Sequence, residues 1–257
     1  MPSEPHAIPM GPAEDLLAQF QTAVADDLTT LAALHHQEVD DALLEVLNSI
    51  GFPACLGLRL NSQRGKEAQG FLQQALKELL TPLTSALLDE LAADYAAIYL
   101  NHGYTASPCE SFWVDEENLV LQAPMFGVRE FYKRHGLAVA DWHVRSDDHL
   151  VHELRFLAVL LQTPHASALP EAARFLDEHL LRWLPRFSER VAKRCDTPFY
   201  AGAAWLTAEY CEELRGVLAE VLDTPRPTAD EIDARMRPKA QGQVAPLTYV
   251  PGLSPSW

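Results

Sequence analysis

The chain has 257 residues, of which 48% are hydrophobic and 22% are charged, and its formal net charge is -16. A chain of this length and composition can bury a core of its own and is not typical of a disordered protein. The excess of 36 acidic over 20 basic residues disfavours contact with nucleic acid or an anionic membrane and favours a basic partner, although solubility alone also explains an acidic surface.

Targeting and redox features predict a cytoplasmic protein. Residues 1–11 lack both an apolar signal segment and a pair of arginines. The longest apolar runs, such as 157–161, are too short to span a bilayer, so we expect no integral membrane segment. The four cysteines form no CxxC pair and no disulfide framework, which is typical of reduced thiols.

The first half of the chain predicts four helices, because apolar side chains recur at intervals of three and four residues. The expected helices cover about 16–31, 36–50, 65–80 and 82–103, and the last has Pro82 in its favoured first position. Residues 101–123 then predict a long loop, in which 118–122 carry a weak strand signal.

The second half predicts further helices at about 124–136, 147–161, 169–184, 185–194 and 199–222, with a loop before Arg145. From residue 223 onward six prolines interrupt the chain, and only 228–236 favours a helix. The fold class is therefore all-α. We expect one helical-bundle domain of about nine to ten helices over 1–222, in two halves, and a Pro-rich tail over 223–257.

Motifs for nucleotide binding, nucleophilic catalysis and zinc catalysis are absent from the sequence, so we predict that the protein is not an enzyme and uses no resident cofactor or metal. An unpatterned site stays an alternative. In that case Asp147, Asp148, His149 and Glu153 would form a nucleotide- or metal-dependent hydrolase centre, since His149 and Glu153 share a helix face.

The segment from Ser146 to Glu153 has two interpretations. In the first, Ser146 caps a helix, and Asp147 and Asp148 lie in its first turn, where carboxylates are favourable. In the second, Asp148 and His149 project from the helix start and recognise a partner through an acceptor and a switchable donor.

Two other clusters also have two interpretations each. The aromatic cluster Tyr95, Tyr99, Tyr104, Phe112 and Trp113 is either core or the lining of a peptide groove. A basic stripe has an arginine at every fourth residue and consists of Arg182, Arg186, Arg190 and Arg194, with Lys193 adjacent. This stripe is either a solvated face paired with acids or an anion site.

Across residues 91–214 the chain resembles the redox-enzyme maturation chaperones of the TorD/DmsD/NarJ group. The matching segments occur in the order that the family has. They are Asp-Tyr-Ala-Ala-Ile-Tyr at 94–99, Ser-Pro-Cys-Glu-Ser-Phe-Trp at 107–113, Val-Arg-Glu-Phe-Tyr at 128–132 with Gly-Leu at 136–137, Asp-Asp-His at 147–149 with Glu-Leu at 153–154, Glu-His-Leu at 178–180 with Trp183, Pro185 and Phe187, and Phe-Tyr at 199–200. The chain departs from the pattern at Ser146, where the family usually has proline, and at Cys109, where an aromatic residue is common.

This resemblance implies an all-helical chaperone with a hinge near the Asp-Asp-His motif, either a monomer or a domain-exchanged dimer. It implies binding to the N-terminal leader of the catalytic subunit of a dimethylsulfoxide-reductase-type molybdopterin oxidoreductase, until the cofactor is inserted and before export. Contact with cofactor-biosynthesis proteins, with the molybdopterin cofactor or with GTP would fit the family, although no phosphate loop is present. The expected leader-binding residues are Tyr95, Ile98, Tyr99, Glu110, Trp113, Asp147, Asp148, His149 and Glu153. A structural subunit of a helical assembly is the third interpretation of the chain.

Overall fold

The structure is a computed structural model that describes residues 12–79, 82–101, 103–115, 119–162 and 167–237. By its internal contacts the chain divides after Arg226 into two units. The described part of the second unit contains α11 (Ala229–Met236), which begins with a capping box between Thr228 and Glu231. None of the helices in the described residues is both long and apolar enough to cross a membrane.

The first unit is built from helices that follow one another without any strand in the described ranges. Their bounds are α1 (Pro12–Leu34), α2 (Asp41–Ser49), α3 (Gln63–Glu78), α4 (Ser85–Tyr95), η1 (Ala96–Leu100), α5 (Glu110–Val114), α6 (Ala123–Arg134), α7 (Leu150–Gln162), α8 (Ala168–Phe175), η2 (Leu176–Leu180), α9 (Leu181–Arg194) and α10 (Pro198–Val221). The segments η1 and η2 are π-helical. Since α4 runs into η1 and α8 runs through η2 into α9, the described residues contain ten continuous helical rods with α11 included. The predicted all-α class is confirmed.

Two of the predicted helix starts differ from the structure for local reasons. The fourth helix begins at Ser85 and not at Pro82, because the Thr84 side chain caps it by accepting a hydrogen bond from the Leu87 N–H. Pro185 does not start a new helix but lies inside α9. Proline has no backbone N–H to donate to the helix. The helix tolerates this loss because Trp183 and Phe187, on either side of Pro185, are fully buried and stabilise the segment.

The predicted loop 101–123 contains the short helix α5, which apolar periodicity in the sequence did not predict. The weak strand signal at 118–122 is wrong for the described residues 119–122, which form no strand, and Asn118 lies outside the described residues. The only pairing of this type in the described chain is a single antiparallel bridge between Cys109 and His149.

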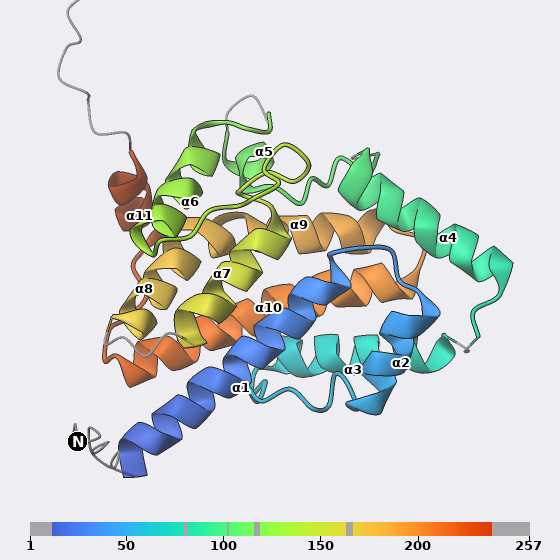
Figure 1. The fold of residues 1–257 in the computed structure, drawn as a ribbon, viewed down its shortest axis with the longest axis horizontal. Coiled ribbons are helices and arrows are strands. Elements are labelled where there is room, and N and C mark those ends of the chain that lie inside the picture. The colour runs from blue at the N-terminus through green and yellow to red at the C-terminus, as the bar shows by residue number, and fades with distance from the viewer. Residues whose placement is uncertain (1–11, 80–81, 102, 116–118, 163–166, 238–257) are drawn as a thin grey trace, which may run out of the picture. The chain divides into compact units, whose positions relative to one another are not determined.

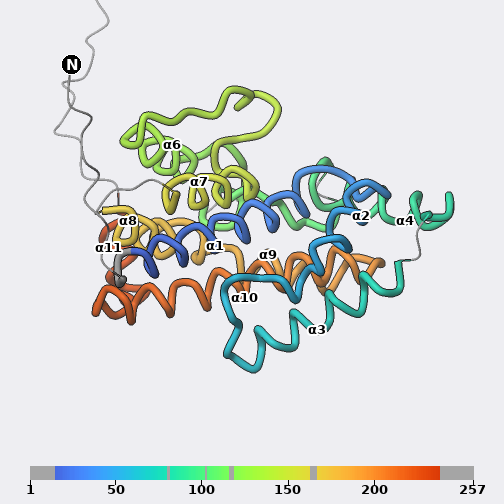
Figure 2. Tube along the Cα trace, turned by 60° about the horizontal axis from the view of Figure 1, so that its bottom comes forward, coloured from blue at the N-terminus to red at the C-terminus, as the bar shows by residue number. Residues whose placement is uncertain are grey.

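Helices distant in the sequence pack side by side in the first unit. Helix α1 lies against α7, and α10 lies against both α3 and α9 (Figures 1 and 2). The α3–α10 approach is close because Gly202 has no side chain, and a Cβ there would meet atoms of Leu72 at 3.1 Å. One core is shared by both halves of the chain, and its largest fully buried side chains include Trp183, Tyr200, Tyr210, Phe175, Phe187 and Phe199.

A buried histidine joins three helices within this core. Nδ1 of His35 lies 2.5 Å from the Tyr99 hydroxyl oxygen, and Nε2 lies 2.9 Å from the Thr207 hydroxyl oxygen. Because the Thr207 hydroxyl donates its hydrogen to the Ala203 carbonyl, Nε2 of His35 is the donor and Nδ1 accepts from Tyr99. Burial lowers the pKa of His35 to about 3, so the ring is neutral at pH 7.

We predict that this histidine makes the fold sensitive to acid. The unfolded chain takes up a proton at His35 near pH 6.5, whereas the folded chain does so only near pH 3, so stability falls as the pH drops through this window. Between pH 7.5 and 5.5 this residue alone should lower the free energy of unfolding by about 1.4 kcal/mol. Urea unfolding of His35→Phe should show lower stability at pH 7.5 and a smaller loss on acidification than the wild type. An unchanged pH dependence in the variant would contradict the assignment.

Candidate functional site

The carboxylate of Asp148 ties together the two loops that flank α5 and α7. Its Oδ2 accepts hydrogen bonds from the Ser111 N–H at 2.8 Å and the Ser111 hydroxyl at 2.5 Å. Its Oδ1 accepts from the Ser146 hydroxyl at 2.5 Å. Since no side chain of its own segment caps α5, Asp148 acts as the cap for that helix from 37 residues away in the sequence.

Backbone hydrogen bonds join the same two loops. The Glu110 N–H donates to the Asp148 carbonyl at 3.0 Å, and the Leu150 N–H donates to the Pro108 carbonyl at 2.8 Å. These bonds lie beside the bridge between Cys109 and His149. Helices α5 and α7 therefore begin at one shared junction, which we call the loop junction and which consists of residues 107–111 and 146–150.

The structure changes the interpretation of the Asp-Asp-His motif. Helix α7 begins at Leu150, so Asp147 is not in its first turn and Ser146 does not cap it. Nδ1 of His149 accepts the Val151 N–H at 3.1 Å instead. Asp148 and His149, which were expected to project from the helix start, are buried, at 0% and 5% exposed. A role of either residue in binding a leader stays a prediction.

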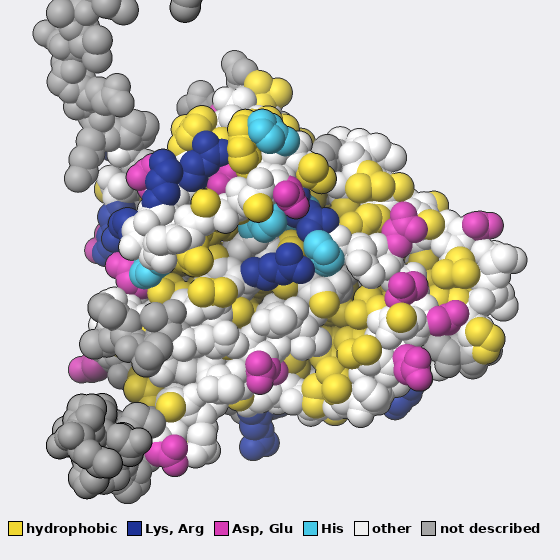
Figure 3. All heavy atoms as spheres, viewed as in Figure 1, with side chains coloured by type: hydrophobic (Ala, Val, Ile, Leu, Met, Phe, Trp, Pro, Cys, Tyr) yellow, Lys and Arg dark blue, Asp and Glu magenta, His cyan; other side chains and the backbone are white. Residues whose placement is uncertain are grey.

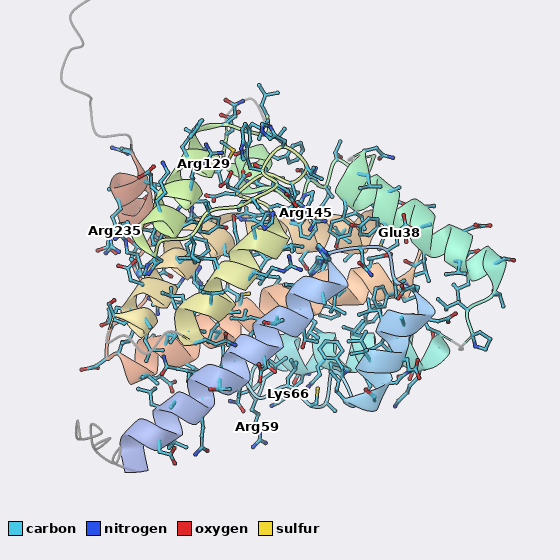
Figure 4. All side chains as sticks on the ribbon, in the orientation of Figure 1. Glu38, Arg59, Lys66, Arg129, Arg145 and Arg235 are labelled. Carbon is cyan, nitrogen blue, oxygen red and sulfur yellow. The ribbon has the colours of Figure 1, made fainter. Side chains whose placement is uncertain are left out.

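Asp147 connects the loop junction to the surface. Its Oδ2 forms an ion pair with Arg129 of α6 at 2.7 Å, and its carbonyl accepts a hydrogen bond from the Tyr132 hydroxyl at 2.9 Å. The Arg129 guanidinium lies 5.5 Å from the ring of Phe126 and 5.3 Å from that of Trp142, within cation–π range. Both rings are solvent-exposed, at 54% and 40%. Arg129 is labelled on α6 in Figure 4.

Two glutamates are buried beneath the loop junction. Glu110 contacts Nδ1 of His179 at 2.8 Å, and its other oxygen lies 3.8 Å from Arg182. Glu153 accepts one hydrogen bond, from the Trp183 indole at 3.3 Å, and its Oε1 has no hydrogen-bond partner. Burial, reinforced by the negative charges of Glu110 and Asp148, holds the pKa of Glu153 well above its usual range.

The carboxylates of Asp147 and Asp148 contact donors of the protein itself. Both oxygens of Asp148 accept hydrogen bonds from hydroxyl and backbone donors, and Oδ2 of Asp147 pairs with Arg129. In the described ranges no group of three or more His, Cys, Asp and Glu side chains is placed to hold a metal ion. The geometry therefore offers no support for the alternative of a hydrolase centre at Asp147, Asp148, His149 and Glu153.

The aromatic cluster belongs mainly to the core. Tyr95, Ile98, Tyr99 and Trp113 are all buried. The Tyr95 hydroxyl donates to the His36 carbonyl at 2.9 Å, and the Trp113 indole donates to the Ser107 carbonyl at 2.7 Å. These bonds satisfy the polar tips of buried rings, so the cluster fixes the loop that leads into α5.

The arginine stripe on α9 has a function that neither sequence interpretation anticipated. Arg186 donates to the Trp113 carbonyl at 2.8 Å, Arg190 to the Thr105 carbonyl at 2.9 Å, and Arg194 to the Tyr104 carbonyl at 2.8 Å. Arg186 and Arg190 also lie 5.4 and 5.0 Å from the Trp113 ring. Part of the stripe is paired with acids, as expected, since Lys193 lies 2.6 Å from Glu189 and Arg182 lies 3.8 Å from Glu110. The other three arginines hold the loop after η1 and the end of α5 through main-chain carbonyls.

Arg129, Phe126 and Trp142 are site residues that the sequence patterns do not predict. Arg129 lies within a segment that supported the family resemblance, but its partner Asp147 is 18 residues away in the sequence. Phe126 and Trp142 lie in α6 and in the following loop, and only the fold brings both rings to one guanidinium. An isolated exposed aromatic residue carries no recognisable signal in a single sequence.

Comparison with known proteins identifies the family. Residues 66–189 match the family model described as nitrate reductase delta subunit. The chain is 31% identical to the chaperone protein TorD of Vibrio vulnificus over 193 residues, which is 70% of this chain and 87% of that protein. The chain belongs to the TorD family of maturation chaperones. TorD of Vibrio cholerae is 32% identical in an alignment that covers 52% of this chain and 64% of the Vibrio protein. TorD of Aliivibrio salmonicida is 25% identical in an alignment that covers 76% of this chain and 94% of the Aliivibrio protein.

The similarity to TorD covers the loop junction. The family model spans most of α3, the helices from α4 to η2 and most of α9, so every leader-binding residue predicted from the sequence lies inside the matched region. Residues before 66 and after 189 lie outside it. In this member of the TorD family the matched region therefore includes the Asp148 network and the Asp147–Arg129 pair.

We predict that Asp148 stabilises the fold. Asp148→Ala removes the acceptor of three hydrogen bonds, two of them buried, and should lower the free energy of unfolding by about 2–5 kcal/mol. Ser146→Ala removes only one of these bonds and should cost about 1 kcal/mol. Chemical denaturation of both variants tests this order.

The competing interpretation, that Asp148 and His149 only recognise a partner, requires a different result. The double variant Asp148→Ala, His149→Ala would then unfold at the same denaturant concentration as the wild type while binding to the partner is lost. That outcome would show that the buried network contributes nothing to stability.

Proposed function

We propose that this protein is a cytoplasmic, client-specific chaperone that binds the leader region of the apo-catalytic subunit of a molybdopterin oxidoreductase. On this proposal it holds the client until the molybdopterin cofactor is inserted and acts by binding, not by catalysis. Membership of the TorD family supports the class of function. The observation that supports the binding mode is the exposed aromatic pair held over Arg129.

Exposed apolar side chains gather around α6 on the face seen in Figure 3. They lie on α6 and on the loops before and after it, and they are Leu119, Val120, Leu121, Phe126, Trp142 and Val144, the last 90% exposed. We call this set the α6 patch. Contiguous exposed apolar surface is typical of a protein-binding site, and the apolar stretch of a leader peptide matches it chemically.

The buried motif positions this patch. Arg129 is held by Asp147 from inside and lies between Phe126 and Trp142 on the outside. In the proposed mechanism, Asp147 and Asp148 fix the loop junction, Arg129 fixes the two rings, and the rings contact the leader. The buried residues Tyr95, Ile98, Tyr99, Glu110, Trp113, His149 and Glu153 then support binding by shaping the junction and need not touch the peptide.

The acidic surface contributes to association. Net charge of this sign attracts the basic start of a twin-arginine leader and accelerates encounter, while apolar burial supplies most of the affinity. High salt screens exposed charges but leaves apolar contacts intact. Binding at about 0.5 M salt should therefore be weakened only moderately.

We predict that the double variant Phe126→Ser, Trp142→Ser lowers the affinity for the client's leader peptide at least tenfold, or about 1.4 kcal/mol. Its melting temperature should stay close to that of the wild type, because both rings are exposed. Val46→Ser is the matched control, since Val46 is 56% exposed on α2, outside the α6 patch. Calorimetry measures all three proteins. Equal affinity of the double variant and the wild type would remove the α6 patch from the proposal.

We also predict no nucleotide turnover of biological size. Both oxygens of Asp148 and Oδ2 of Asp147 already contact the protein's own donors, which disfavours the activation of water by these two carboxylates. A phosphate-release assay with ATP and GTP should give no more than background. Turnover above roughly 1 per second that is lost in Asp147→Asn would instead favour the hydrolase alternative.

A further inference from the structure

Four basic side chains from different parts of the fold meet next to the loop junction. His36 follows α1, Arg145 precedes α7, and His152 and Arg155 lie one turn apart on α7. The Arg145 guanidinium donates to Nδ1 of His36 at 2.5 Å and to the His36 carbonyl at 2.7 Å. Lys or Arg and His side chains adjoin one another in the middle of the face in Figure 3, and Arg145 is labelled there in Figure 4. We call this set the basic cluster.

The ion pairs of the described residues leave the two arginines of the basic cluster without a carboxylate partner. In the part of the chain that the structure describes, neither Arg145 nor Arg155 forms an ion pair with a carboxylate. Asp147 acts on His152 electrostatically, but its Oδ2 is paired with Arg129. This lack of compensation is notable in a chain with 36 acidic residues, in which Arg129 and Arg215 do have buried aspartate partners.

The cationic groups act against one another. Burial and then the charge of Arg145 lower the pKa of Arg155. Burial and then Arg145 and Arg155 lower the pKa of His36, and the same causes lower that of His152 to about 4, against a smaller opposing effect of Asp147. At neutral pH the two imidazoles are therefore uncharged while the two guanidinium groups carry the charge.

The imidazoles keep donor capacity. Because a guanidinium can only donate, Nδ1 of His36 is the acceptor, and its proton is on Nε2. Nε2 of His152 is buried and has no hydrogen-bond partner in the structure. Arg145 uses two of its five N–H groups on His36. A multivalent anion would meet several unused donors and two positive charges at this place.

We propose that the basic cluster of His36, Arg145, His152 and Arg155 is a binding site for a small phosphate-bearing anion. A phosphate group has enough oxygens and charge to meet two guanidinium and two imidazole groups, whereas a single carboxylate has only two oxygens. The proposal does not depend on leader binding, since the α6 patch and the basic cluster share no residue. The anion relieves the repulsion between Arg145 and Arg155.

Binding at this site is linked to protons. A bound anion favours the charged form of His36 and His152 and so raises their pKa values. The groups that act electrostatically on His152 are Arg145, Arg155, Asp147 and His36. The complex therefore takes up protons, and the affinity rises as the pH falls from 8 to 6.

Calorimetry with inorganic pyrophosphate tests the proposal on the full chain at low salt. We expect saturable binding to one site, tighter at pH 6.5 than at pH 7.5, with proton uptake that appears as a dependence of the heat on buffer ionisation. Arg155→Gln should weaken binding at least tenfold and leave the melting curve unchanged, because this exposed side chain has no ion-pair partner among the described residues. His152→Ala should reduce the proton uptake.

The matched control is Arg59→Gln, which removes an exposed arginine at a different place in the fold, as Figure 4 shows. This variant should bind pyrophosphate like the wild type. Absence of binding to the wild type, or an equal loss in Arg59→Gln and Arg155→Gln, would overturn the proposal. Malonate that binds as tightly as pyrophosphate would overturn the assignment to phosphate. A leader peptide bound normally by Arg155→Gln would confirm that the two sites are separate.

Discussion

The fold depends on a buried carboxylate at a place where two helices begin. Helix starts expose N–H groups that need acceptors, and the starts of α5 and α7 meet inside the protein where water cannot supply them. Asp148 supplies acceptors to Ser111 and Ser146, and its own carbonyl accepts from Glu110. The junction is also held from outside, since Arg186 of α9 donates to the Trp113 carbonyl of α5, and it contacts α6 through the Asp147–Arg129 pair.

The protein uses the same device in other places. Asp94 accepts from the Tyr104 hydroxyl and from the backbone and hydroxyl of Thr197, and so it fixes the turn between α9 and α10. Asp27 on α1 accepts from the N–H groups of Gly57 and Leu58 in the connection before α3. In each case a buried aspartate satisfies loop N–H groups that have no partner in a helix, which fixes a loop without a sheet or a disulfide.

Local charge in this protein differs from its average. A net charge of -16 describes the whole chain, but the carboxylates near the loop junction are turned inward and the neighbouring arginines outward. Arg129 is compensated by Asp147, whereas Arg145 and Arg155 are not compensated within the described chain. Basic groups and exposed aromatic rings therefore occupy the face around α7 and α6 of an acidic molecule, which makes that face chemically distinct.

The sequence alone determined the fold class, because apolar side chains at intervals of three and four residues require helices with one buried face, and it determined the family through ordered motifs. The sequence could not place Asp148. Its hydrogen-bond partner Ser111 is 37 residues away along the chain, and no pattern in one sequence shows that the two residues are in contact. The same holds for the pairing of Arg129 with Asp147 and for the meeting of His36 with Arg145, 109 residues apart. Only the tertiary structure decided that the motif residues are buried, and that exposed rings and arginines without a carboxylate partner among the described residues lie near them, because burial and charge pairing depend on which helices pack together.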